Sequence, residues 1–229
     1  MKKFIFLFLS GVALISCEKE VEMNSSAMQA RINNSFWKAI NFNATKSPTN
    51  SLTVVGSSGI GNLTLYTTST AKGTYTLGGT NQANGVSYVL ADGSHYSTGI
   101  TSSSVNKIAL TNGGTNYVVA ESVATNAISG TGSGLKVKIV SVSAGGVITG
   151  VQIDTPGEGY RAGDLITITT GGGNAKVTVQ NVSKSNGEIT ITENTGSTIS
   201  GEFKFTAFDP ETDEVTSCRD GVFYKVPLN

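Results

Sequence analysis

The chain has 229 residues, and its 16 Lys and Arg residues are balanced by 16 Asp and Glu residues. This balance gives no basic surface for a polyanion, so we expect no nucleic acid partner. Charged residues make up 14% of the chain and glycine contributes 28 residues, a composition that disfavours long surface helices. Two cysteines and one histidine are too few for a disulfide scaffold, a structural zinc site or most histidine-dependent catalysis.

The first residues have the layout of an export signal. Two lysines at positions 2 and 3 precede an almost unbroken apolar run at residues 4–15. This run is shorter than the roughly 20 apolar residues that a permanent transmembrane helix needs. The segment Leu14-Ile15-Ser16-Cys17 resembles the bacterial lipobox, in which the chain is cut before the cysteine. We therefore expect a lipoprotein signal peptide at residues 1–16 and a lipid bilayer as partner through an acylated, palmitate-bearing Cys17. The alternative is an ordinary signal peptide that ends by chance at a cysteine.

Residues 17–26 are short and polar, and they predict a tether between the membrane and the folded domain. The Lys and Glu residues directly after Cys17 are similar to the surface-export signals of lipoproteins in the Bacteroidetes, although Val21 interrupts the acidic run. We expect a lipid-anchored protein of the outer membrane that either faces the periplasm or is exposed at the cell surface.

From residue 27 onward the pattern is one of strands and turns. Phe203, Phe205 and Ala207 alternate with polar residues, which is the period of a half-buried strand. Further short runs rich in β-branched and aromatic residues lie at 52–55, 62–66, 74–77, 87–90 and 222–226. Turn residues separate them at 33–34, 57–59, 78–79 and 91–93. These features predict an all-β fold with an antiparallel β-sandwich or barrel-like domain, and residues 117–127 are the only segment that suggests a short helix.

Four segments at the two ends of this region form a recognisable set, namely residues 30–37, 73–77, 199–207 and 221–223. They resemble the DUF6252 family of small Bacteroidetes lipoproteins of unknown function. The family has Gly where this chain has Asn34, and Asn also accepts a turn with positive φ. The resemblance implies a fold and an envelope location but no activity.

The aromatic residues of these segments predict a core. We expect six of them to face one another across two sheets, namely Phe36, Trp37, Tyr75, Phe203, Phe205 and Phe223. The alternative for Trp37 is an exposed platform on which a sugar ring stacks.

The glycine-rich middle of the chain, residues 104–184, does not share this resemblance. It holds an internal echo, since residues 132–139 resemble 172–179 and residues 113–117 resemble 157–160, which predicts a repeated β-hairpin module. Residues 154–168 are similar to Gly-x-Gly-Tyr-x-x-Gly-Asp segments of phage tail-fibre and baseplate proteins. We therefore expect a β module at 104–184, inserted into a discontinuous β domain formed by 27–103 plus 185–229. A single continuous β domain is the alternative.

No known catalytic motif is present, so we assign no catalytic residues and no cofactor. His95 has no partner motif and is expected at the surface. Asp154, Glu158 and Asp164 lie close enough in sequence for a glycosidase pair, but capping of turns is the simpler role for Asp154 and Asp164. Cys218 is the one thiol besides Cys17, and we interpret it as an inert residue.

The strongest metal candidates are Asp209, Glu211 and Asp213, whose alternate spacing resembles the start of a calcium loop. The glycine and the distal glutamate of the helical calcium motif are missing, so a solvated acidic turn is the simpler interpretation.

Three functions remain open. The first is a non-catalytic, membrane-anchored envelope lipoprotein that presents a β domain to a protein or a glycan. The second is a structural envelope protein that forms homo-oligomers through the inserted module. The third is a carbohydrate-active enzyme.

Overall fold

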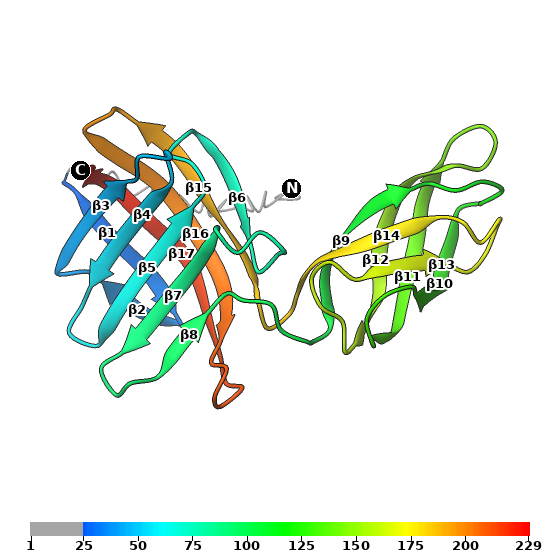
Figure 1. Ribbon diagram of the computed structural model, residues 1–229, viewed down its shortest axis with the longest axis horizontal. Coiled ribbons are helices and arrows are strands. Elements are labelled where there is room, and N and C mark those ends of the chain that lie inside the picture. Colours follow the sequence, from blue (N-terminus) through cyan, green and yellow to red (C-terminus); the bar gives the residue numbers. More distant parts are fainter. Residues whose placement is uncertain (1–24) are drawn as a thin grey trace, which may run out of the picture.

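The computed structural model describes residues 25–229, which form strands, turns and loops arranged as two antiparallel sheets (Figure 1). The all-β prediction is confirmed. The signal peptide, Cys17 and the first part of the tether lie outside the described residues. Within the part of the chain that is described, no helix is long and apolar enough to cross a membrane.

The larger sheet has 11 strands, and we call it and its loops the large domain. Its strands are β1 (Ala27–Ile32), β2 (Ser35–Lys38), β3 (Asn41–Lys46), β4 (Leu52–Ser57), β5 (Gly61–Thr67), β6 (Gly73–Leu77), β7 (Gly85–Leu90), β8 (His95–Ser97), β15 (Asn186–Asn194), β16 (Thr198–Phe208) and β17 (Val215–Pro227). The order is β2-β1-β17-β16-β8-β7-β5-β4-β3, while β15 pairs with both β16 and β6. The sheet curls until β3 meets the C-terminal end, where Ala44 forms a parallel bridge to Leu228. The large domain is therefore barrel-like, which is one of the two predicted forms, and it is not a sandwich of two separate sheets.

The local patterns explain these strands. Phe203, Phe205 and Ala207 alternate with more exposed residues along β16 and point into one core, as predicted. The β1–β2 hairpin turns through Asn33 and Asn34, whose φ angles of 48° and 66° are the left-handed values that such a turn needs.

The predicted aromatic core is correct for Trp37, Phe203, Phe205 and Phe223, and Tyr75 packs against it from the edge. The prediction is wrong for Phe36, because 62% of its surface is exposed. Neighbouring residues of a strand point to opposite faces, so Trp37 and Phe36 cannot both enter the core.

The smaller sheet has six strands, and we call it and its loops the small domain. Its strands are β9 (Val105–Asn112), β10 (Ala120–Ala127), β11 (Ser133–Val142), β12 (Ile148–Glu158), β13 (Leu165–Ile168) and β14 (Lys176–Val182). The helix suggested for residues 117–127 is wrong, because residues 120–127 pair on one side with β11 and on the other with β13. Hydrogen bonds and packing against two neighbouring strands stabilise the extended conformation more than a weak helical pattern favours a helix.

The echo in the sequence corresponds to a pseudo-two-fold axis. The strand order β12-β11-β10-β13-β14-β9 is symmetric about the β10–β13 pair, so β11 corresponds to β14. Each half contributes one buried tyrosine. The Tyr117 hydroxyl accepts the N–H of Ala175 at 2.9 Å, and the Tyr160 hydroxyl accepts the N–H of Leu135 at 3.4 Å. Leu135 and Ala175 occupy equivalent positions of the echo, so the two tyrosines act as equivalent braces.

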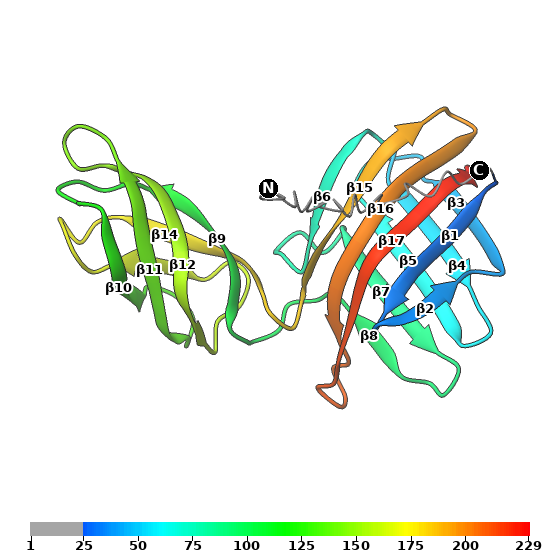
Figure 2. The ribbon, with the colours of Figure 1, turned by 180° about the vertical axis from the view of Figure 1, so that it is seen from behind.

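The two domains lie side by side and are joined by two adjacent linkers (Figures 1 and 2). Their hydrophobic cores share no residue. The Ser183 hydroxyl lies 2.7 Å from the hydroxyls of both Ser103 and Ser104, and the Asn181 amide of β14 donates to the Leu77 carbonyl at the end of β6. Neutral hydrogen bonds and an ion pair between Lys184 of the second linker and Asp213 of the large domain therefore hold the junction.

Candidate functional site

The acidic turn predicted as a calcium site connects β16 to β17. Asp209 accepts the backbone N–H of Glu211 at 2.8 Å, and this hydrogen bond lowers the pKa of the Asp209 carboxyl. Asp213 instead forms an ion pair with Lys184. Within residues 25–229, no group of three or more Asp, Glu, His or Cys side chains is arranged to hold a metal ion. The carboxylates of this turn therefore serve different partners.

The three acidic residues considered for a glycosidase have structural partners of their own. Asp154 on β12 accepts a hydrogen bond of 2.7 Å from the Ser122 hydroxyl. Asp164 is buried and accepts the backbone N–H of Arg161 at 2.9 Å, which is the turn-capping geometry expected for it. Glu158 is exposed at the end of β12.

His95 lies at the surface at the start of β8, as expected. Its Nε2 atom is 2.9 Å from the Ser87 hydroxyl of the neighbouring strand β7. No hydrogen bond joins the imidazole to a carboxylate of the described residues, so the third member of a triad is not assembled there.

Cys218 and Trp37 both face the interior of the large domain. Burial, followed by the nearby charge of Asp220, raises the pKa of the Cys218 thiol to about 12, which keeps it protonated and unreactive. Trp37 is 1% exposed, so an exposed sugar platform at this residue is wrong.

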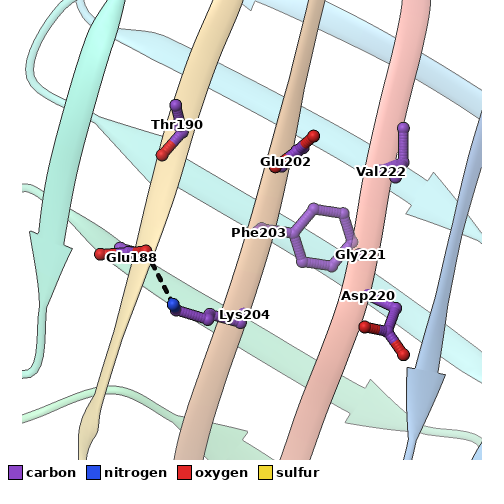
Figure 3. A pocket seen from close by; sticks show the side chains of 8 residues that line it. All are labelled: Glu188, Thr190, Glu202, Phe203, Lys204, Asp220, Gly221 and Val222. Carbon is purple, nitrogen blue, oxygen red and sulfur yellow. Dashed lines mark ion pairs between the residues drawn. The ribbon is translucent and has the colours of Figure 1, made fainter.

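A shallow groove of about 330 Å³ crosses the outer face of β15, β16 and β17 (Figure 3). Glu188, Glu202 and Asp220 line it, and Lys204 reaches across to Glu188 at 2.9 Å. Phe203 lies at its floor beside Gly221. An exposed ion pair of this kind adds about 0–1 kcal/mol, so the groove offers charge but little rigidity.

A larger groove of about 510 Å³ runs between the two domains, and we call it the interdomain groove. Every residue that lines it is uncharged, and the lining consists of Thr74, Tyr75, Thr76, Gly79, Thr80, Asn81, Asn84, Ala109, Thr111, Gly163, Thr178, Val179 and Gln180. The Tyr75 hydroxyl donates to the Ala71 carbonyl at 2.7 Å, which fixes the ring at one wall. Sequence reasoning missed this groove because β6 and β14 lie about a hundred positions apart, and neither the family resemblance of residues 73–77 nor the repeat at 172–179 indicates that the two strands meet.

A third hollow, which we call the end cavity, has a volume of about 200 Å³ and lies at the end of the large domain where the β1–β2 and β7–β8 turns meet. Trp37, Tyr88 and Thr216 form its buried walls. Trp37 belongs to the segment 30–37 that carries the family resemblance, but Tyr88 and Thr216 belong to no segment that the sequence singled out, so the hollow itself could not be predicted.

Comparison with known proteins gives one match. The model of a family described as "Domain of unknown function (DUF6252)" matches residues 24–133 and 124–227. The two matched stretches overlap and together span residues 24–227, so they include the small domain. The expectation that residues 104–184 do not share the resemblance is therefore wrong. No curated protein and no solved structure matches the chain.

Proposed function

The chain belongs to the DUF6252 family, and we propose that it is a lipid-anchored, non-catalytic envelope protein that binds a neutral glycan in the interdomain groove. The observation that carries this proposal is the uncharged lining of the groove between the two β domains.

The lining suits a sugar chemically. Sugar hydroxyl groups both donate and accept hydrogen bonds, and the hydroxyls of threonine and the amides of Asn81 and Gln180 can do the same. A tyrosine ring fixed at one wall offers an apolar face to the sugar ring. The volume of about 510 Å³ lies within the range of ligand pockets, about 300–1,000 Å³.

The anchoring part of the proposal rests on Cys17 and the signal peptide before it. The Ser26 hydroxyl donates to the Lys225 carbonyl at 2.8 Å, so the tether would join the large domain next to the end of β17. Protease shaving of intact cells, compared between the native protein and Cys17→Ser, tests this. We expect the native protein in the membrane fraction and Cys17→Ser released from it. Equal fractionation of the two proteins would contradict lipid anchoring, and shaving of the native protein separates surface exposure from a periplasm-facing position.

The glycan proposal is tested by screening the mature chain, residues 17–229 with Cys17→Ser, against neutral oligosaccharides, followed by calorimetric titration of the best binder. Gln180→Ala should weaken binding about tenfold, since it removes hydrogen bonds from the groove. Gln152→Ala is the matched control, because Gln152 is exposed on β12 outside the groove. Equal losses in both variants, or no binding to any oligosaccharide, would refute the assignment and leave a protein as the partner to search for.

One observation favours self-association as a second candidate. Val118 and Val119, in the loop between β9 and β10, are 71% and 60% exposed. Adjacent exposed valines at a loop are a contact that a second copy could cover. Light scattering of the mature chain should then give a mass that falls to that of a monomer in Val118→Ser/Val119→Ser, and a monomer without substitution would remove this candidate.

A further inference from the structure

A fourth hollow, which we call the basic hollow, lies on the outer face of the large domain and has a volume of about 250 Å³. It shares Lys204 with the shallow groove of β15, β16 and β17, which we call the outer groove, so the two lie next to each other (Figure 3). Three cationic side chains line the basic hollow, namely Arg31, Lys204 and Arg219, and no acidic residue lines it.

The pairing of β1 with β17 brings two of these cations together. The register shifts between Gln29 and Arg31, and beyond the shift Arg31 lies directly opposite Arg219. On β17, Asp220 has a φ angle of 54°, and both Arg219 and Asp220 are exposed, as in a strand that carries a bulge. Like charges directly opposite each other in an antiparallel pair are destabilising. An anion bound by both guanidinium groups would remove this repulsion.

Arg219 is the cation of this group that forms no ion pair within the described residues. Its Nη2 atom instead donates to the Oδ1 atom of Asn34 at 2.6 Å. Asn34 belongs to the left-handed turn between β1 and β2, so this hydrogen bond ties the guanidinium to a fixed point of the backbone. A guanidinium has five N–H donors in a planar fork, and one bond to an amide leaves the others for a ligand.

The other two cations have exposed acidic partners. The Nε atom of Arg31 lies 3.9 Å from a carboxylate oxygen of Asp220, and the Nζ atom of Lys204 lies 2.9 Å from Glu188. The side chains of both pairs are between 40% and 70% exposed. Exposed ion pairs contribute little to stability, so a ligand that offers several oxygens can compete for these two cations.

Neutral donors complete the basic hollow. Thr206 and Ser217 are register partners on β16 and β17, and both line the hollow, where their hydroxyls can donate hydrogen bonds. The donors thus come from three strands, an arrangement that suits a tetrahedral group with several oxygens better than a planar carboxylate. We propose that the basic hollow binds the phosphate or sulfate ester group of a small polar molecule.

The outer groove restricts the rest of this ligand. Glu202 and Asp220 line the outer groove next to the basic hollow. A second anionic group on the ligand would meet these carboxylates, so the ligand carries one anionic group and is otherwise neutral. This inference depends neither on the proposed glycan binding nor on the lipid anchor, because the basic hollow shares no residue with the interdomain groove.

Four hexoses test the proposal on the ¹⁵N-labelled mature chain, residues 17–229 with Cys17→Ser. Glucose 6-phosphate and glucose 6-sulfate carry the tetrahedral group, glucuronate carries a carboxylate, and glucose is neutral. We expect both esters to shift the amide signals of Ser217 and Arg219 saturably, glucuronate to bind at least about threefold more weakly, and glucose to cause no shift. Added salt should weaken the binding of both esters, because exposed charges are screened.

The absence of a saturable shift with either ester, or equal shifts with glucose, would overturn the proposal. Glucuronate binding as tight as that of the esters would overturn the preference for a tetrahedral group.

Variants then identify the residues that bind the ester. Arg219→Gln should weaken glucose 6-phosphate about tenfold or more, because it removes charged hydrogen bonds. Arg219→Lys keeps the charge but loses the planar fork, and it should weaken binding about threefold. Arg31→Gln provides a second loss of about tenfold at an independent position. Arg161→Gln is the matched control, because Arg161 is an exposed arginine of the small domain outside the basic hollow.

The control variant should bind glucose 6-phosphate as tightly as the unsubstituted mature chain. Equal losses in Arg219→Gln and Arg161→Gln would show that only the net charge of the protein matters, and this result would overturn the site. Thermal unfolding of each variant verifies that it is folded, which is expected because the substituted side chains are exposed.

Discussion

The rings of Phe203 and Phe223 stack with their centroids 6.4 Å apart, and each ring lies against a glycine of the neighbouring strand. The register places Phe203 opposite Gly221 and Phe223 opposite Gly201. This reciprocal arrangement lets two large rings share one face of adjacent strands. Both rings belong to the core of the large domain, and Phe203 also lines the outer groove.

We predict that Gly221→Ala destabilises the large domain by about 1–3 kcal/mol. A Cβ atom at this position would lie 2.5 Å from both the Phe203 ring and the Phe203 carbonyl oxygen, so the strand pair would have to shift. Gly59→Ala is the matched control, because its Cβ would meet no atom within 4 Å. Urea unfolding should show a large loss for Gly221→Ala and almost none for Gly59→Ala, and equal losses would show that the close approach is not what matters.

A second prediction concerns the two tyrosine braces of the small domain. The Tyr117 hydroxyl donates to the Ile168 carbonyl at 3.1 Å and accepts the Ala175 N–H, whereas the Tyr160 hydroxyl accepts one long hydrogen bond from Leu135. Tyr117→Phe should therefore cost about 1–3 kcal/mol and Tyr160→Phe less than about 1 kcal/mol. Thermal unfolding of both variants checks the order, and a larger loss for Tyr160→Phe would show that the two halves differ in some other way.

The third prediction is a pH dependence at Cys218. Its pKa is raised from 9.0 to about 12 in the folded protein, mainly by burial, so the unfolded thiol loses its proton first as the pH rises. Stability at this site is fully present below pH 9.0 and declines between pH 9.0 and about 12, by at most about 1.4 kcal/mol per pH unit. Urea unfolding across this range should show the decline, and Cys218→Ala should reduce its slope. A native thiol that reacts rapidly with a thiol reagent at pH 8 would contradict the inert interpretation.

The fourth prediction concerns acid. The pKa of Asp209 is lowered below its ordinary value of 3.8, chiefly by the backbone N–H of Glu211. The carboxylate therefore contributes stability above that value, and this contribution is lost as the pH falls through the lowered pKa. Asp209→Asn should reduce the fall of the unfolding temperature below pH 4, and Glu211→Gln is the control because only the backbone of Glu211 takes part.

Calcium should leave the unfolding temperature of the native protein unchanged, and a calcium-dependent rise would revive the metal candidates Asp209, Glu211 and Asp213.

Local structure could be predicted from the sequence where a single segment determines it. The turn at Asn33 and Asn34 depends on residues that accept positive φ, and the inward direction of Phe203 and Phe205 depends on strict alternation. The echo between residues 132–139 and 172–179 already contained the symmetry of the small domain.

What could not be predicted depends on distant partners. Alternation requires that Phe36 and Trp37 point to opposite faces, but the sheet around them decides which face is buried. The interdomain groove combines Tyr75 with Gln180, and the end cavity combines Trp37 with Thr216, so neither site exists before the chain has folded. Motif searches detect residues that are close in sequence, whereas each of these sites joins segments that lie far apart in the chain.

The position of β17 in the large sheet also affects how the chain is made. β17 is the last strand, yet it lies between β1, the first strand, and β16. The last strand of the small domain ends at Val182. In contrast, β1 is joined to the rest of the large sheet through β17, which requires residues 215–227. The small domain can therefore fold while the large domain is still open, and the large sheet closes around β17 only after residues 215–227 have been synthesised. Until then β1 has β2 as its one neighbouring strand, so this part of the large sheet is the last part of the fold to form.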